Sequence, residues 1–227
     1  LGWQKSNLII LGARPSVGKT AFSLNLLRNA AVDNNMPVAI FSLEMSAIEL
    51  VKRLMTTESG LAADKIKGGV KLDQADWDQL TYSTKALAKS PIYIDDTPGI
   101  SIMEFRTKAK RLVKSKGVRF IVIDYLQLMQ SAGSGHSWSN ESRTQAVSDI
   151  SRMLKIMAKE LNVPVICLSQ LSRANESRQD KRPMLSDLRE SGAIEQDADV
   201  VIGLYREGYY NAECEEPNVS EAIVLKN

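Results

Sequence analysis

The chain has few of the residues that build covalent cross-links or metal centres. Its 227 residues include two cysteines, Cys167 and Cys214, and one histidine, His136. Cys167 falls in a predicted strand and Cys214 in an acidic loop, so neither a disulfide framework nor a zinc site is indicated. Because His136 has no metal partner, it is more typical of a solvated loop residue. This cysteine usage fits a reducing, cytoplasmic compartment.

Long apolar runs and an excess of charge of one sign are also absent. No apolar run approaches the ~20 residues that a membrane-spanning helix needs, and no signal peptide is recognisable. Membrane partners are therefore not expected. The chain carries 29 basic and 27 acidic residues, a formal net charge of +2. A general affinity for polyanions does not follow from so small a charge, so any contact with nucleic acid must come from local clusters.

Short apolar segments alternate with helical patterns along the whole chain. Apolar strands are predicted at 8–11, 38–42, 92–95, 120–124, 165–169, 200–205 and from 222. Helices are predicted from Thr20 to about 33, and at about 46–58, 73–89, 101–117 and 143–161, with loops at 59–72, 131–142 and 171–197. Strands that are apolar throughout and alternate with helices predict an α/β fold, in which a mainly parallel central sheet carries helices on both faces.

A phosphate-binding loop follows the first predicted strand. Residues 8–20 read Leu-Ile-Ile-Leu-Gly-Ala-Arg-Pro-Ser-Val-Gly-Lys-Thr, an apolar strand that enters a loop ending in Gly18-Lys19-Thr20 at a helix start. In such a P-loop the backbone N–H groups cradle phosphates, the lysine reaches the β- and γ-phosphates, and the Thr hydroxyl holds Mg²⁺. Ala13, not Gly12, occupies the first glycine position, which a negative φ would tolerate.

A carboxylate that completes the Mg²⁺ shell should follow an apolar strand. Asp95 and Asp96 follow the third predicted strand, and Asp124 follows the fourth. The longer apolar run before Asp124 favours it, because we expect this strand to be central and to lie beside the strand of the P-loop. The alternative for Asp95 and Asp96 is a turn into the next loop. Thr20 and Asp124 are thus the predicted metal ligands. The predicted nucleotide-binding residues are Ala13, Arg14, Pro15, Ser16, Val17, Gly18, Lys19, Thr20, Asp124 and Arg206.

Two further polar residues end predicted strands, and spacing alone leaves their roles open. Glu44 follows the second strand and could orient or deprotonate an attacking water; equally, it could be a surface glutamate favoured by a helix N-terminus. Gln170 ends the fifth strand, where a neutral amide could bind a γ-phosphate and respond to its loss. The alternative is an ordinary glutamine in a polar loop.

Five segments together resemble the C-terminal motor domain of DnaB-type replicative DNA helicases. They are ARPSVGKT at 13–20, FSLEMS at 41–46, IDYLQL at 123–128, SQLSR at 169–173 and DLRESGAIEQDAD at 187–199. The resemblance covers essentially the whole chain and implies a RecA-like P-loop NTPase core. It further implies a homo-hexameric ring that encircles single-stranded DNA and hydrolyses ATP with Mg²⁺ at subunit interfaces. Such a ring moves 5′ to 3′ and unwinds the duplex at the fork, with a primase and a helicase loader as partners.

The resemblance also implies roles for individual residues. It makes Lys19, Glu44 and Gln170 the catalytic set, and it places residues 131–142 in a loop of the DNA channel. Lys226 matches a lysine that reaches into the neighbour's ATP site. The residues implied in holding the DNA backbone are Arg189, Glu190, Ser191 and Gly192.

We expect the 227 residues to be one RecA-like domain of a longer protein. The chain begins at Leu1 rather than Met and stops at Asn227 within a predicted strand. The family's N-terminal domain, linker helix and extreme C-terminus, including the arginine finger two residues after the lysine at Lys226, are then missing. Because an arginine finger is worth roughly 10³–10⁵ in rate, the expectation for the fragment is a weakened ring and slow hydrolysis.

Two other functions share most of these features. One is a RecA-like recombination or repair ATPase that coats DNA as a filament, although the aromatic-bearing DNA loop of that family is not recognisable here. The other is a nucleotide-dependent assembly module that does not translocate. The basic stretch at 106–119 is a third candidate for DNA contact, but helical spacing distributes its charges around the helix and favours a solvated face.

Overall fold

The computed structural model describes residues 2–126, 140–188, 192–211 and 213–227. Its strands are β1 (Leu8–Ala13), β2 (Val38–Ser42), β3 (Ile92–Asp95), β4 (Phe120–Asp124), β5 (Val165–Gln170), β6 (Val200–Tyr205) and β7 (Glu221–Lys226). Its α-helices are α1 (Lys19–Arg28), α2 (Ala47–Ser59), α3 (Ala63–Lys67), α4 (Gln74–Lys89), α5 (Ile102–Lys116), α6 (Asn140–Leu161), α7 (Gly192–Asp197) and α8 (Glu207–Tyr210). A π-helical turn, η1 (Asn29–Asp33), continues α1, and two 3₁₀ turns are η3 (Arg173–Ser177) and η4 (Leu185–Asp187).

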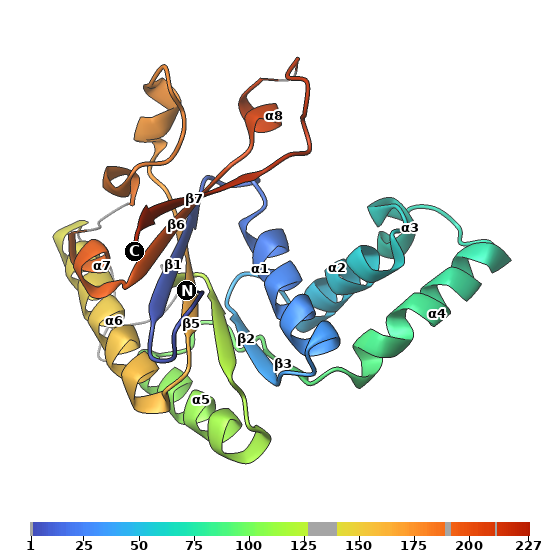
Figure 1. Cartoon of the computed structure of the whole chain (residues 1–227), viewed down its shortest axis with the longest axis horizontal. Coiled ribbons are helices and arrows are strands. Elements are labelled where there is room, and N and C mark those ends of the chain that lie inside the picture. The colour runs from blue at the N-terminus through green and yellow to red at the C-terminus, as the bar shows by residue number, and fades with distance from the viewer. Residues whose placement is uncertain (1, 127–139, 189–191, 212) are drawn as a thin grey trace.

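The strands form one sheet in the order β3-β2-β4-β5-β1-β6-β7, in which β7 alone runs antiparallel to its neighbour. Helices cover both faces (Figure 1), so the predicted fold class is confirmed. One expectation about the sheet is wrong. β4, which ends in Asp124, does not lie beside β1, because β5 is hydrogen-bonded to both and separates them. Hydrophobicity identifies a buried strand but does not determine its neighbours.

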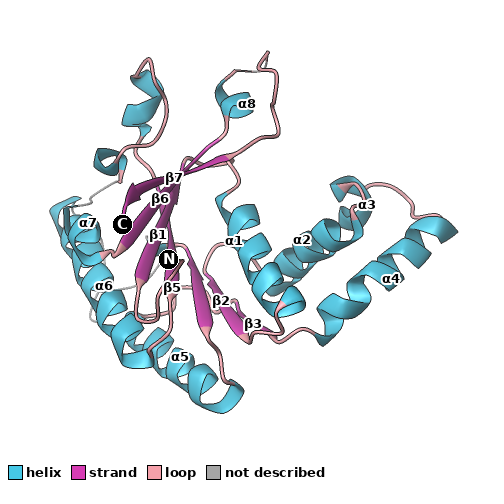
Figure 2. Ribbon diagram, viewed as in Figure 1, coloured by secondary structure: helices cyan, strands magenta, loops and turns pink. Residues whose placement is uncertain are grey.

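The two faces of the sheet have separate cores, because successive side chains of a strand point to opposite faces. From β1, Leu8 and Ile10 pack in the core formed with α5 and α6. Ile9 and Leu11 pack in the core formed with α1 and α2. Figure 2 shows the strands between these two helical layers. Burial of both faces makes the strands apolar throughout and brings the carboxyl ends of the six parallel strands to one edge, where ligands bind in such sheets.

Capping residues determine where several helices begin. Ser46 and Asp73 each form a reciprocal capping box, with Glu49 and Asp76, and start α2 and α4 as predicted. Ser101 accepts a hydrogen bond from Glu104 N and starts α5. No helix among the described residues combines the length and the apolar character that crossing a bilayer requires.

Short helical turns interrupt two of the predicted loops. The five-residue α3 lies within 59–72, and η3, η4 and α7 lie within 171–197. These turns are too short for a helical hydrophobic period, so a period-based prediction does not detect them. α6 also begins three residues before the predicted start at 143. The predicted channel loop at 131–142 lies mostly outside the described residues.

Candidate active site

The P-loop places a lysine and a hydroxyl beside a buried carboxylate. Thr20 Oγ1 donates a hydrogen bond to Asp124 Oδ2 at 2.7 Å, and Lys19 Nζ lies 3.9 Å from Asp124 Oδ1. Asp124 is fully buried, and its Oδ1 has no hydrogen-bond partner among the described residues. β1 ends at Ala13 and β4 at Asp124, so their carboxyl ends bring together residues more than 100 positions apart in the sequence.

The two glycines of this segment have different roles. Gly18 has a φ of 114°, in the left-handed region, and precedes the first residue of α1. Gly12 instead allows a close approach, because a Cβ atom on it would lie 2.7 Å from Leu171 Cδ2. Ala13 is not among the described non-glycine residues with positive φ, as expected for its place in the motif.

The ammonium group of Lys19 is largely shielded from water by the surrounding protein. Burial lowers the pKa of Lys19 below its usual value, while the nearby Asp124 and Glu44 carboxylates act in the opposite direction. The ammonium also lies 4.5 Å from the centre of the Tyr125 ring. Triphosphate oxygens would supply the missing negative charge, so the site is suited to an anion beside Lys19.

A cavity of about 460 Å³ opens above the P-loop. Its lining includes Lys19 and Thr20 together with Glu44 and Gln170, so the structure brings the predicted catalytic residues to one space. Gln170 is the ladder partner of Ala13, which places it directly beside the loop.

Three further residues line the cavity but were not predicted from the sequence, namely Met45, Arg53 and Tyr125. Arg53 lies within α2, and nothing in its local sequence separates it from a surface arginine.

The rival carboxylates already have structural partners. Asp95 pairs with Lys108 Nζ at 2.9 Å and accepts a hydrogen bond from Thr97 N. Asp96 Oδ2 accepts a hydrogen bond from Ala47 N at 2.8 Å, at the start of α2. Asp124 is the candidate that contacts Lys19 and Thr20 of the P-loop, which favours it as the metal-side carboxylate.

The donor set fits Mg²⁺. Mg²⁺ prefers oxygen ligands and usually binds through one or two protein groups together with substrate phosphates. The Thr20 hydroxyl and the buried Asp124 carboxylate, with an unbonded Oδ1, provide such a pair. The described residues contain no cluster of three or more His, Cys, Asp or Glu side chains that could hold a metal without a substrate.

The two arginines predicted to bind nucleotide lie differently. The Arg14 side chain is 7% exposed and donates to Glu176 Oε1 and to Leu171 O. These two hydrogen bonds hold the guanidinium against η3 and the exit of β5, and Arg14 also lines the cavity described above. Arg206 Nη2 lies 3.5 Å from Ser16 O, and its buried Nε has no hydrogen-bond partner in the described part of the chain.

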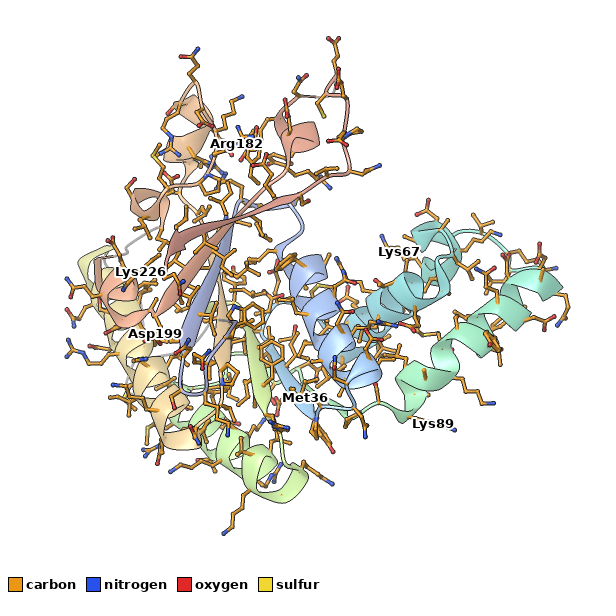
Figure 3. The ribbon with its side chains drawn as sticks, viewed as in Figure 1. Met36, Lys67, Lys89, Arg182, Asp199 and Lys226 are labelled. Carbon is orange, nitrogen blue, oxygen red and sulfur yellow. The ribbon has the colours of Figure 1, made fainter. Side chains whose placement is uncertain are left out.

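Lys226 lies at the opposite end of the sheet from this site. It pairs with Val201 at the start of β6, and its Nζ donates to Glu195 O and Ala198 O at 2.6 and 2.7 Å. Figure 3 labels the position of Lys226 in the molecule. It therefore cannot serve the P-loop of its own chain. Of the predicted DNA-binding residues, Arg189, Glu190 and Ser191 lie outside the described residues, and Gly192 is the first residue of α7.

The basic stretch at 106–119 is partly neutralised within the fold. Arg106 and Lys110 both bind Glu160 of α6, and Lys108 binds Asp95 of β3. Its other basic residues are exposed, namely Arg111, Lys114, Lys116 and Arg119. The ion pairs on α5 account for three of its charges without a nucleic acid.

Comparison with known proteins gives one consistent result. The family model described as "DnaB-like helicase C terminal domain" matches residues 1–227. The chain is 55% identical over 225 residues to the replicative DNA helicase DnaB of Geobacillus stearothermophilus and 53% identical to the replicative DNA helicase DnaC of Bacillus subtilis. It covers 48% of each of these proteins and is itself 99% covered, so it spans about half the length of these relatives.

Solved structures agree. One solved ATPase domain superposes with a TM-score of 0.90 at 45% identity, covering 99% of this chain and 78% of that one. A DnaB-like replicative helicase, reported with its interactions with primase, gives the same TM-score and identity over 99% of this chain and 54% of that one.

Proposed function

Because the chain belongs to the family of DnaB-like helicase C-terminal domains, we propose that it is the motor domain of a ring-shaped replicative DNA helicase. In this proposal six copies surround single-stranded DNA and hydrolyse ATP where neighbouring copies meet. The ring moves 5′ to 3′ along the enclosed strand and unwinds the duplex at the replication fork.

One observation carries the proposal. A P-loop lysine and threonine lie against a buried carboxylate, and Glu44 and Gln170 line the same cavity. A phosphate-binding loop alone would support only nucleotide binding. A carboxylate and an amide facing the same space add groups that can act on a water molecule and on a γ-phosphate.

Each residue then has a role in hydrolysis. Lys19 binds the β- and γ-phosphates, and Thr20 and Asp124 hold Mg²⁺, which when bound neutralises charge on the phosphate oxygens. Glu44 orients the attacking water and receives its proton. Gln170 binds the γ-phosphate and passes its loss to the segment that follows it.

Contacts outside the chain's own site complete the motor. Lys226 reaches the ATP of the neighbouring copy when its Nζ exchanges the Glu195 and Ala198 carbonyls for phosphate oxygens, and its distance from its own P-loop is consistent with this role. The segment from Arg189 to Gly192 holds the DNA backbone through N–H groups and one arginine, which predicts little sequence preference and a strong dependence on salt. We further propose that the assembled helicase meets a primase, as the similar DnaB-like helicase does, and a loader, and that it acts in the cytoplasm.

Steady-state ATP hydrolysis with and without single-stranded DNA tests this function. We expect stimulation by oligonucleotides of unrelated sequence, and a rate per subunit that rises with protein concentration as shared sites assemble. The Glu44→Gln variant is the control and should assemble but retain only a small residual turnover.

Two outcomes would favour the alternatives. Hydrolysis indifferent to DNA would indicate a nucleotide-dependent assembly module. DNA-stimulated hydrolysis by open filaments rather than closed six-membered rings, seen by electron microscopy, would indicate a recombination ATPase.

A further inference from the structure

The carboxylate assigned to water activation sits on a short turn. Glu44 is the third residue of the turn from Ser42 to Met45, between β2 and α2, and its side chain is exposed at the cavity. An exposed side chain is not held by packing, so the backbone of the turn sets the point from which the Glu44 carboxylate reaches into the cavity. Since a misplacement of about 1 Å can reduce a rate roughly 100-fold, the groups that fix this backbone matter for turnover.

One hydroxyl group closes the turn. Ser42 is 1% exposed, and its Oγ donates a hydrogen bond to Met45 O at 2.7 Å. The same oxygen accepts a hydrogen bond from Met45 N at 3.2 Å. The hydroxyl thus satisfies both backbone groups of Met45 and holds the residues on either side of Glu44 in one conformation.

The same turn is attached to the strand that carries Asp124. Ser42 is the ladder partner of Asp124, and Leu43 N donates to Asp124 O at 2.6 Å. On the far side, Asp96 Oδ2 accepts a hydrogen bond from Ala47 N at 2.8 Å, beside the Ser46–Glu49 capping box. Both ends of the turn are therefore fixed, and the metal-side carboxylate and Glu44 share one frame.

We propose that Ser42 is a positioning residue for ATP hydrolysis, because its hydroxyl closes the Ser42–Met45 turn and so places the Glu44 carboxylate. The inference rests on the role proposed for Glu44. Ser42 does not line the nucleotide cavity, so it acts on turnover through Glu44 and not through nucleotide binding.

The variant Ser42→Ala tests the idea, with ATP and Mg²⁺ as the probe. We expect kcat to fall about tenfold or more while KM for ATP stays within about twofold, since the binding residues keep their places. Ser42→Thr retains the hydroxyl and should recover most of the lost kcat.

The matched control is Ser151→Ala, which also removes one buried hydroxyl oxygen. Ser151 is 0% exposed, but its Oγ has no hydrogen-bond partner among the described residues, so kcat should not change.

A double-mutant cycle separates positioning from a general structural effect. In the Glu44→Gln background, Ser42→Ala should cause no further loss, because the group that it positions is already absent. Asp96 is exposed, and Asp96→Ala removes its hydrogen bond to Ala47 N at the far side of the turn. This variant should show the same pattern with a smaller loss of kcat, which keeps the test usable if Ser42→Ala does not fold.

Three results would overturn the inference: an unchanged kcat in Ser42→Ala, a loss that multiplies in the Glu44→Gln background, or a rise in KM equal to the fall in kcat. If kcat is unchanged in Ser42→Ala, a strongly reduced turnover of the Glu44→Gln variant would leave the proposed function standing. Full activity of Glu44→Gln would instead remove the role of Glu44 on which both proposals depend.

Discussion

At the amino ends of the strands, the Asp199 carboxylate accepts several hydrogen bonds. At the carboxyl ends, in contrast, one buried polar atom each of Asp124 and Arg206 accepts or donates none among the described residues. Asp199, before β6, accepts hydrogen bonds from Leu8 N at 2.7 Å and from Lys155 Nζ at 2.5 and 2.6 Å. At the other edge, Asp124 Oδ1 and Arg206 Nε are buried without hydrogen-bond partners in the described part of the chain.

This difference between the two edges of the sheet separates residues that stabilise the fold from residues that bind and hydrolyse nucleotide. A buried polar atom without a partner costs about 1–3 kcal/mol, so the carboxyl edge is less stable than it could be. The Asp124 carboxylate bears this cost beside Lys19 and Thr20, where a bound Mg²⁺ would satisfy it. We therefore expect changes at the carboxyl edge to affect binding and turnover, and changes at the amino edge to affect the free energy of unfolding.

The largest effect is expected from Lys19→Ala. It should weaken binding of a fluorescent ATP analogue roughly 100-fold, since hydrogen bonds to charged groups contribute up to about 3 kcal/mol. Circular dichroism should show an unchanged fold, and the exposed Lys5→Ala is the control. ATP turnover retained in Lys19→Ala would refute the P-loop assignment.

Asp124→Asn should separate turnover from binding. We expect kcat to fall about 100-fold and the affinity for ATP to change less than about tenfold, because a metal ligand contributes several kcal/mol mainly where charge develops. Asp95→Asn is the comparison, and its turnover should stay near that of the parent chain. The reverse pattern would transfer the metal-side role to the β3 carboxylates.

At the opposite edge, Asp199→Asn should lower the free energy of unfolding by about 1–2 kcal/mol through loss of charge-assisted hydrogen bonds. Turnover of the folded protein should not change. The matched control is Asp180→Asn, whose carboxylate is exposed and lies 3.9 Å from the Arg182 guanidinium; we expect a change within about 0.5 kcal/mol. Urea unfolding measures both, and equal losses would mean that the Asp199 contacts contribute nothing special.

The smallest effect concerns pH. The Arg106 guanidinium and the Lys110 ammonium lower the pKa of Glu160 from its ordinary 4.5 to about 2. A carboxyl group whose pKa is lower in the folded state stabilises fully above its unfolded pKa and loses that contribution as the pH falls. The window is therefore about pH 4.5 to 2. As the pH is lowered across this window, the midpoint of urea unfolding should fall less steeply in Glu160→Gln than in the parent chain. Identical slopes in the two proteins would contradict the assignment.

Local patterns predicted the features that local forces determine. Apolar segments between capping residues gave the strands and most helix starts, and the phosphate loop was readable because its residues are consecutive. The neighbours of each strand were not predictable, since they depend on contacts between distant segments. The expectation that β4 adjoins β1 was wrong for this reason.

The site shows the same division. Lys19 and Thr20 follow from the motif, and the longer apolar run already favoured Asp124. The contacts that Asp95 and Asp96 make elsewhere support that choice. Tyr125 and Arg53 reach the cavity through the packing of β4 and α2, and no local pattern marks them. The role of residues 189–191 stays a prediction.

The contact between Gly12 and Leu171 has a mechanical consequence. With no room for even a methyl group between them, and with interiors of low compressibility, the end of β1 cannot approach the exit of β5 any further. Because β1 and β5 are also hydrogen-bonded neighbours, with Ala13 opposite Gln170, we expect the phosphate loop and Gln170 to move together. Glu44 is carried by β2, two strands beyond β5 in the sheet, so any relative motion during a turnover cycle would open or close the gap between Glu44 and the phosphate loop.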